Sequence, residues 1–217
     1  MADIFTEVEE DLRRERAKNL WTRYGRYFIA LAVIAILAAG AHTWWRSYER
    51  SQQLETAERY QAALSEGSID SAPAEAAGRL ESLAQNAPGG YELAALMRAA
   101  GLYGQAGDHA AAAQIYEAIA ADSGVDELYR DLAEVLAIAQ AAQVDGRDAE
   151  DLLARIAPHE EAGAPWRFTA LEAAAGLALQ AGDPAGARER LSAIADSADA
   201  PQQSRSRAAE ILRAVGE

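Results

Sequence analysis

A motif of one alanine followed by two large apolar residues recurs along most of this chain and constrains its fold more than any other feature. The three residues lie at positions i, i+4 and i+7, which share one face of an α-helix. The copies are Ala76, Leu80 and Leu83; Ala112, Tyr116 and Ile119; Ala149, Leu153 and Ile156; Ala187, Leu191 and Ile194. The steps from one alanine to the next are 36, 37 and 38 residues. A period of this length predicts an all-α stack of helical units that share a core with their neighbours.

Turn residues precede each copy of the motif and predict where the helices begin and end. Glycine supplies the left-handed conformation that stops a helix, aspartate caps the next helix, and proline is tolerated in a first turn. The turns read Glu66-Gly67-Ser68, Gly107-Asp108, Asp145-Gly146 and Gly182-Asp183-Pro184. The first helices of the pairs are therefore expected over 47–65, 91–106, 126–143 and 166–181. A last helix over 201–215 is expected to cap the open end of the stack, with Ile211, Leu212 and Val215 facing inward.

An uncharged stretch over 27–45 precedes the repeats and predicts a single transmembrane helix. From Tyr24 to Trp45 the chain would extend ~33 Å as a helix, which is enough to cross a hydrocarbon core of about 30 Å. Tyr24 and Tyr27 lie at one end, and Trp44, Trp45 and Tyr48 lie at the other. Aromatic residues at both ends are typical of the two membrane–water boundaries.

The charges around this stretch predict its orientation. Residues 13–26 carry six basic side chains and residues 46–59 carry three, so the N-terminus is expected in the cytoplasm. We therefore expect a cytoplasmic amphipathic tail over 1–26, a transmembrane helix over 27–45 and a periplasmic repeat domain over 46–217. The alternative is a cleavable signal peptide, because Ala39, Gly40 and Ala41 form a small-x-small site before His42.

Two helical faces in this region are candidates for contact with other molecules. In the tail, Ile4, Val8 and Leu12 recur every four residues among charged side chains, which is typical of a helix at a membrane surface or of a docking helix. Within the span, a face of small residues would let a second membrane helix approach closely, although alanine is frequent enough here to produce such a face by chance. This face comprises Ala32, Ala35, Ala39 and His42.

The sequence carries no recognisable catalytic or cofactor site. It has no Cys, and His42, His109 and His159 are far apart, without metal-ligand spacing. The glycines do not form the pattern of a phosphate-binding loop or of a dinucleotide-binding motif. With 34 acidic and 20 basic residues the net charge is -14, which disfavours nucleic acid as a partner. We therefore expect a non-enzymatic protein with no cofactor, metal or small-molecule substrate.

The second unit resembles the tetratricopeptide repeat family. It has that family's helix-turn-helix residues at the family's spacing, namely Leu96, Ala100, Tyr103, Gly107, Asp108, Ala112 and Tyr116. The fourth unit keeps Leu171, Ala175, Gly182, Asp183 and Ala187 but has Ala178 where the family prefers Tyr. The resemblance implies a right-handed α-solenoid of about four degenerate helix pairs plus a C-terminal capping helix.

The same resemblance implies a binding groove along the first helix of each pair. Members of this family bind extended peptides or partner helices on such a surface. On the family register the groove residues are Ala94, Met97, Gly101, Gly104, Gln105, Asp131, Glu134, Ile138, Thr169, Glu172, Gly176 and Gln180. Small residues beside Met97 and Ile138 would leave room for an apolar guest. The glycines equally fit close helix packing, so both interpretations stay open here.

The layout of the whole chain resembles the YfgM-like ancillary subunits of the SecYEG translocon. The residues that carry this resemblance are Glu9-Glu10-Asp11-Leu12-Arg13-Arg14, Leu20-Trp21 and Arg23-Tyr24-Gly25-Arg26-Tyr27, which lead straight into the apolar stretch. The resemblance implies an inner-membrane scaffold that links a SecYEG-type translocon to periplasmic chaperones, to prolyl isomerase-like folding factors or to unfolded clients.

Two other classes of function remain as alternatives. The same features fit a membrane-anchored assembly subunit of another envelope complex, in division, respiration or cell-wall synthesis. A periplasmic hydrolase or metal-binding protein built on helices is a third possibility, for which the sequence offers no catalytic or ligand-binding motif.

Overall fold

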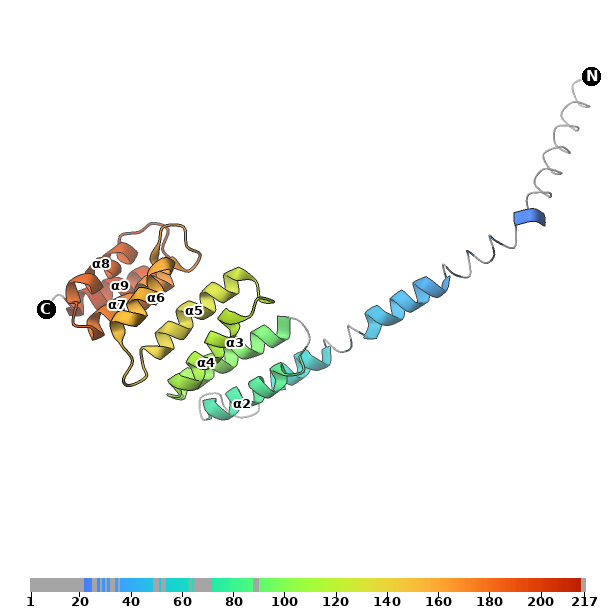
Figure 1. The fold of residues 1–217 in the computed structure, drawn as a ribbon, viewed down its shortest axis with the longest axis horizontal. Coiled ribbons are helices and arrows are strands. Elements are labelled where there is room, and N and C mark those ends of the chain that lie inside the picture. Colours follow the sequence, from blue (N-terminus) through green and yellow to red (C-terminus); the bar gives the residue numbers. More distant parts are fainter. Residues whose placement is uncertain are drawn as a thin grey trace, which may run out of the picture. The chain divides into compact units, whose positions relative to one another are not determined.

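The computed structural model divides the chain into two compact units, Met1–Leu54 and Glu55–Glu217. The structure describes residues 22–24, 27, 29, 31, 34, 36–48, 51, 54–62, 64, 72–87 and 90–215. These described residues form helices and the turns and loops that connect them, with no strand among them, so the predicted all-α fold is confirmed for them (Figure 1).

In the first unit, residues 36–48 are helical and carry large apolar side chains that remain exposed. The exposed fractions of Leu37, Trp44 and Trp45 are 66%, 71% and 63%. Within the part of the chain that the structure describes, no helix combines the length and the apolar character needed to cross a membrane. The expected span therefore stays a prediction.

Several sequence predictions for this unit concern residues outside the described ones. The expected tail helix with Ile4, Val8 and Leu12 is one of them, as are Ala32 and Ala35 of the small-residue face. Ala39 and His42 of that face are described, and both are helical and exposed.

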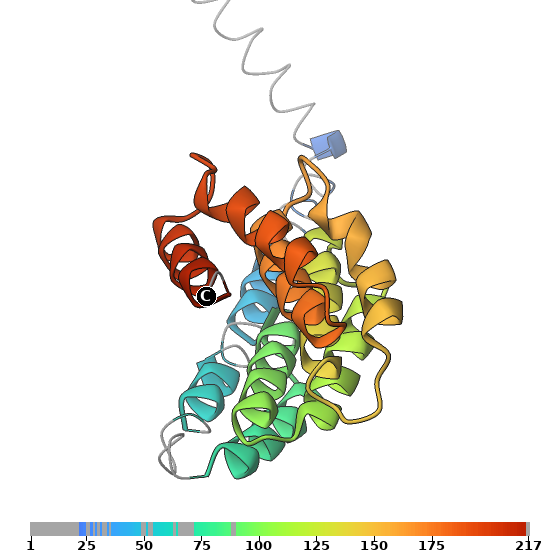
Figure 2. The ribbon, with the colours of Figure 1, turned by 90° about the vertical axis from the view of Figure 1, so that its left-hand side faces the viewer.

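The second unit is a series of antiparallel helices in which each helix packs on the next (Figures 1 and 2). Residues 55–62 are helical, and Tyr60 packs on the first core cluster of this unit. The helices that follow are α2 (Pro73–Ala84), α3 (Gly90–Gln105), α4 (His109–Ala121), α5 (Glu127–Ala141), α6 (Ala149–Ile156), the 3-10 helix η1 (Ala157–Glu160), α7 (Arg167–Gln180), α8 (Pro184–Ala195) and α9 (Gln202–Val215). The predicted first helices over 91–106, 126–143 and 166–181 and the last helix over 201–215 are thus confirmed within two residues at each end. Of the predicted helix over 47–65, the residues that the structure describes are helical.

The recurring motif forms the core in three of its four copies. Ala76, Ala112 and Ala187 are fully buried where neighbouring helices approach each other. In the third copy, the core position expected at Leu153 is occupied by Leu152, which is 4% exposed and packs with the fully buried Ile156. Helix α6 has only 8 residues and gives way to a 3-10 turn, so its packing face differs from those of the longer second helices.

Turn chemistry explains the observed helix ends. Gly107, Gly146 and Gly182 have φ values of 82°, 79° and 76°, a left-handed conformation that glycine adopts without strain. The side chains of Asp108 and Asp183 accept hydrogen bonds from the backbone N–H groups of residues 111 and 186, at 3.0 and 2.9 Å. The cap of α6 is Asp148 rather than the expected Asp145. The predicted turn at 66–68 lies outside the described residues.

Helix α9 covers the end of the stack, as expected. It packs on α8, and Ala208 is buried in a core cluster that also contains Leu191. Ile211 and Leu212 are partly buried against the same cluster. The Arg188 guanidinium of α8 donates a hydrogen bond of 3.0 Å to the backbone oxygen of Val215, which ties the last turn of α9 to α8.

Candidate protein-binding site

A pocket of about 210 Å³ lies between α5 and α7, which are the first helices of consecutive pairs and contact each other directly. We call it the α5–α7 pocket. Three predicted groove residues, Glu172, Gly176 and Gln180, form its α7 wall. The other lining residues are Ala139, Ala142, Gln143, Ala173 and Leu177. The structure therefore brings together the α7 part of the predicted groove.

The α7 wall of this pocket is held by an ion pair with the capping helix. Arg207 of α9 donates a hydrogen bond of 2.9 Å from Nη2 to Oε2 of Glu172. Hydrogen bonding to Glu172 is the main reason that the pKa of Arg207 is raised. Gly176 is exposed, and an added Cβ would meet no heavy atom within 4 Å. Gly176 therefore leaves open space in the pocket instead of serving close helix packing.

The predicted groove residues on α3 lie in a different environment. Met97 is partly buried against the core cluster that contains Tyr116, and its backbone oxygen accepts a 3.4 Å hydrogen bond from the Tyr116 hydroxyl. A Cβ on Gly101 would contact the same hydroxyl at 3.6 Å. Gln105 and Ala94 are exposed. Gly101 thus lies against a packed side chain of α4.

Gly104 marks a close approach of α3 to the side chain of Gln140 on α5. A Cβ at this position would lie 2.8 Å from Oε1 of Gln140. That oxygen accepts a hydrogen bond of 2.8 Å from Nδ1 of His109, so the first residue of α4 is tied to α5. His109 is thus a partly buried link between α4 and α5.

The α5 positions predicted from the family register do not face the α5–α7 pocket. Ile138 is fully buried in the core formed by α5, α6 and α7, so the expectation that it offers an apolar surface to a guest is corrected. Oε2 of Glu134 accepts a 3.3 Å hydrogen bond from Nε2 of His159 in η1. Asp131 is partly buried, and Thr169 on α7 is exposed. This side of the pocket is formed instead by Ala139, which follows Ile138, and by Ala142 and Gln143, which come just after the end of α5.

Two tyrosines, Tyr103 of α3 and Tyr116 of α4, have raised pKa values. Burial is the main cause for Tyr116, and the positive charge of Arg98 opposes it in part. For Tyr103 burial again leads, and the nearby Glu81 carboxylate, which accepts a 3.2 Å hydrogen bond from the phenol, adds to the effect. Both phenols therefore stay protonated at neutral pH and act as packing groups with a hydrogen-bonded tip.

A larger cleft of about 620 Å³ lies where α3 and α5 begin and α4 ends, and sequence reasoning did not predict it. We call it the α3–α5 cleft. Its lining is mainly apolar and includes three carboxylates. The lining residues are Gly90, Glu92, Leu93, Leu96, Ala118, Ile119, Asp122, Gly124, Val125, Asp126 and Tyr129. A sequence signal that could have found it is Tyr129, a large aromatic residue in the first turn of the helix that Asp126 caps.

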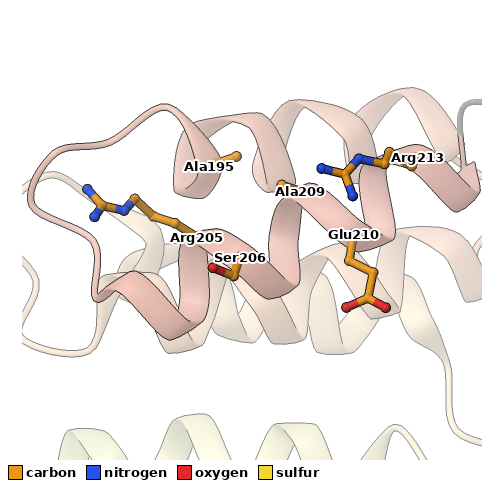
Figure 3. A pocket seen from close by; sticks show the side chains of 6 residues that line it. All are labelled: Ala195, Arg205, Ser206, Ala209, Glu210 and Arg213. Carbon is orange, nitrogen blue, oxygen red and sulfur yellow. The ribbon is translucent and has the colours of Figure 1, made fainter.

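A third depression, of about 470 Å³, lies between α8 and α9. Figure 3 shows that the charged ends of Arg205 and Glu210 point in different directions, so they do not converge on a common ligand. Arg205 is also engaged by the backbone oxygen of Ser197, 3.4 Å from Nη1. Among the described residues, no group of three or more His, Asp and Glu side chains is placed to hold a metal ion.

Comparisons with known proteins agree with this geometry. The tetratricopeptide repeat-like domain family matches residues 18–164, about two thirds of the chain. Comparison with curated proteins found no match, and comparison with solved structures found none. The matched region includes α2 to α6. It therefore contains all three helices that form the α3–α5 cleft, namely α3, α4 and α5. This protein belongs to the tetratricopeptide repeat-like domain family.

Proposed function

We propose that this protein is a non-enzymatic adaptor that is anchored in a bacterial inner membrane and binds other proteins through its periplasmic repeat domain. The observation that carries the adaptor role is the open α5–α7 pocket between the first helices of consecutive pairs. Its lining combines small, apolar and amide side chains with one carboxylate that is already paired. Such a surface suits reversible contact with a peptide segment or a partner helix better than it suits chemistry.

The anchor is supported by residues of the first unit. Leu37, Trp44 and Trp45 are exposed on the helical residues 36–48, and the sequence has no charged residue between positions 27 and 45. Large apolar groups that surround a helix need a nonpolar environment, and a bilayer is one that the flanking aromatic residues also fit. The family match begins at residue 18, so the apolar stretch lies within the matched region. The excess of basic residues over 13–26 favours a cytoplasmic N-terminus.

The partner that we propose is the protein-export machinery, namely a SecYEG-type translocon together with periplasmic folding factors and emerging clients. Support comes from the resemblance of residues 9–27 to the ancillary translocon subunits and from the proposed topology. An adaptor with a pocket on the outer side would meet chains as they leave the channel.

Photocrosslinking in native membranes tests this proposal. A photoreactive amino acid replaces Gln180, which lines the α5–α7 pocket, and in a matched control it replaces Glu189, which is exposed on α8. We expect channel subunits, folding factors or exported chains to be crosslinked from position 180 and not from position 189. Recovery of subunits of another envelope complex from position 180 would replace the export assignment while keeping the adaptor role. Equal crosslinking from both positions would contradict the proposed pocket.

The anchor is tested separately in intact inner-membrane preparations. We expect the protein to resist extraction at alkaline pH, and we expect proteases added from the periplasmic side to digest the repeat domain. Release of the whole protein by alkaline extraction, or protection of the repeat domain from such proteases, would contradict the anchor and its orientation.

A further inference from the structure

We propose that the α3–α5 cleft is a second binding site, which takes a short segment of a partner protein with an apolar side chain next to lysine or arginine. The cleft lies beside the first turn of α5, whereas the α5–α7 pocket lies at the last turn of that helix. The inference therefore concerns a different surface and stands independently of the export machinery as a partner.

The floor of the cleft offers an apolar side chain a place to bury. Leu93 and Leu96 of α3 and Val125 of the loop before α5 line it, and each of them is only partly buried. Ile119 also lines the cleft and is 3% exposed. A guest side chain that covers these groups would remove apolar surface from water, which is the main favourable contribution in peptide binding.

The rim of the cleft keeps large apolar groups in water. Among the described residues of the second unit, the large apolar side chains that remain exposed are Leu128, Tyr129 and Leu179. Tyr129 lines the cleft and is 45% exposed, and its neighbour Leu128 is 43% exposed. Tyrosine at the edge of a pocket is typical of a binding hot spot, because its ring buries apolar area while its hydroxyl stays wet.

The charge of the cleft determines the chemistry of the guest. Glu92, Asp122 and Asp126 line the cleft, and none of the lining residues is basic. Asp122 and Asp126 are fixed in place by hydrogen bonds of 2.8 and 3.0 Å from the backbone N–H groups of residues 124 and 128. An ionised carboxylate has several lone-pair sites, so each can accept a further bond from a cation.

This charge pattern disfavours two other occupants. A second copy of the chain carries the same net charge of -14, and nucleic acid is a polyanion, so both are repelled by the three carboxylates. A basic residue beside an apolar anchor is attracted by them. The guest that matches both the floor and the rim is thus a cationic, apolar peptide segment.

The test uses the full-length protein in detergent micelles and a short fluorescein-labelled peptide with the sequence Lys-Leu-Phe-Lys in a Gly/Ser background. Fluorescence anisotropy measures Kd at low salt and at about 0.5 M salt, where exposed charges are largely screened. Comparison peptides carry Glu-Leu-Phe-Glu or Lys-Ser-Ser-Lys in the same background. We expect binding of the first peptide, weakened by salt, and at least about tenfold weaker binding of the other two.

Two exposed positions locate the site without disturbing the core. We expect Tyr129→Ala to weaken binding about tenfold, which corresponds to about 1.4 kcal/mol, and Glu92→Lys to weaken it similarly and to reduce its dependence on salt. The matched controls are Leu179→Ala and Glu189→Lys, which change an exposed apolar residue and an exposed acid elsewhere. We expect them to leave Kd within about twofold. Circular dichroism verifies that each variant is folded.

Clear results would overturn the proposal. Three outcomes would do so: the Lys-Leu-Phe-Lys peptide does not bind up to about 1 mM, the Glu-flanked peptide binds equally well, or the Kd is unchanged in both cleft variants. Equal weakening in the control variants would also remove the assignment of binding to this cleft. Such results would leave the photocrosslinking outcome at position 180 unaffected, so the two proposals fail separately.

Discussion

Arg207 of α9 pairs with Glu172 of α7, so the capping helix holds one wall of the α5–α7 pocket. Nη2 of the guanidinium donates a hydrogen bond of 2.9 Å to Oε2, and Nε faces Oε1, which gives the pair two parallel contacts. The two residues are 35 positions apart in the chain. The C-terminal helix therefore completes the core of the last pair and also fixes a carboxylate beside the candidate binding surface.

We expect Arg207→Ala to lower the free energy of unfolding by less than about 1 kcal/mol, with a larger effect at low salt. The limit is small because the side chains of Arg207 and Glu172 are 48% and 30% exposed, so solvent and salt screen their attraction. Urea denaturation at two salt concentrations measures the effect. Arg213→Ala, on the same helix, is the control and should change stability by no more than about 0.5 kcal/mol. An effect of Arg207→Ala that is independent of salt would contradict the ion-pair explanation.

We expect Gly176→Ala to raise the free energy of unfolding by about 0.5–1 kcal/mol, because alanine loses less conformational entropy than glycine in a helix interior. The added methyl group meets no heavy atom within 4 Å, so no clash offsets the gain. Gly146→Ala is the matched comparison. Its φ is 79°, where a Cβ is strained, so this variant should lose stability. A loss of stability in Gly176→Ala would show that this position is packed.

Gly104→Ala should lack the gain expected at position 176, although both glycines lie within helices. The new Cβ would lie within 3.1 Å of three atoms of the Gln140 side chain, so the amide must move away from His109 and give up its hydrogen bond. Such a bond contributes about 0.5–1.5 kcal/mol, which cancels the helix gain. Urea denaturation of a double-mutant cycle with Gln140→Ala checks this explanation. In the Gln140→Ala background, Gly104→Ala should become stabilising, and the absence of any coupling would contradict the contact.

The helix pairs could be predicted from the sequence because the residues that begin and end each helix act locally. Gly107 and Gly182 stop helices, and Asp108 and Asp183 begin the next ones, so the boundaries follow from turn chemistry alone. The spacing of the alanine motif then predicts which face of each second helix is buried. The third copy broke this rule because α6 ends after 8 residues and Pro158 lies in the 3-10 turn that follows.

The candidate site was predictable only in part, because it depends on how each helix is rotated against its neighbours. Glu172, Gly176 and Gln180 of α7 line the pocket as the register predicts, whereas Ile138 of α5 is fully buried in the core that α5 shares with α6 and α7. The α3–α5 cleft is formed by the ends of three helices and a loop, and no periodicity within a single helix describes such a place. Whether a residue lines a pocket or lies in the core is seen only from the burial of its side chain in the folded stack.

The last prediction concerns the response of the fold to alkaline pH. Tyr116 is 5% exposed, and burial raises the pKa of its phenol above the usual value near 10. The folded state therefore holds this proton more tightly than the unfolded chain does. The stabilising contribution is complete below pH ~10, and it is lost as the pH rises from there through the raised pKa, because the unfolded chain ionises first.

We expect the free energy of unfolding of the wild-type protein to fall more steeply between pH 8 and pH 11 than that of Tyr116→Phe, which has no phenol to ionise at this position. At pH 8 the variant should be less stable by no more than about 1 kcal/mol, because it loses only the long 3.4 Å bond to the backbone oxygen of Met97. Urea denaturation at both pH values measures the difference. Ile119→Val removes a methylene from the same core cluster without changing any titratable group, so its effect should be equal at both pH values. If Tyr116→Phe behaved like Ile119→Val in this respect, burial of the Tyr116 phenol would not be a source of the alkaline loss of stability.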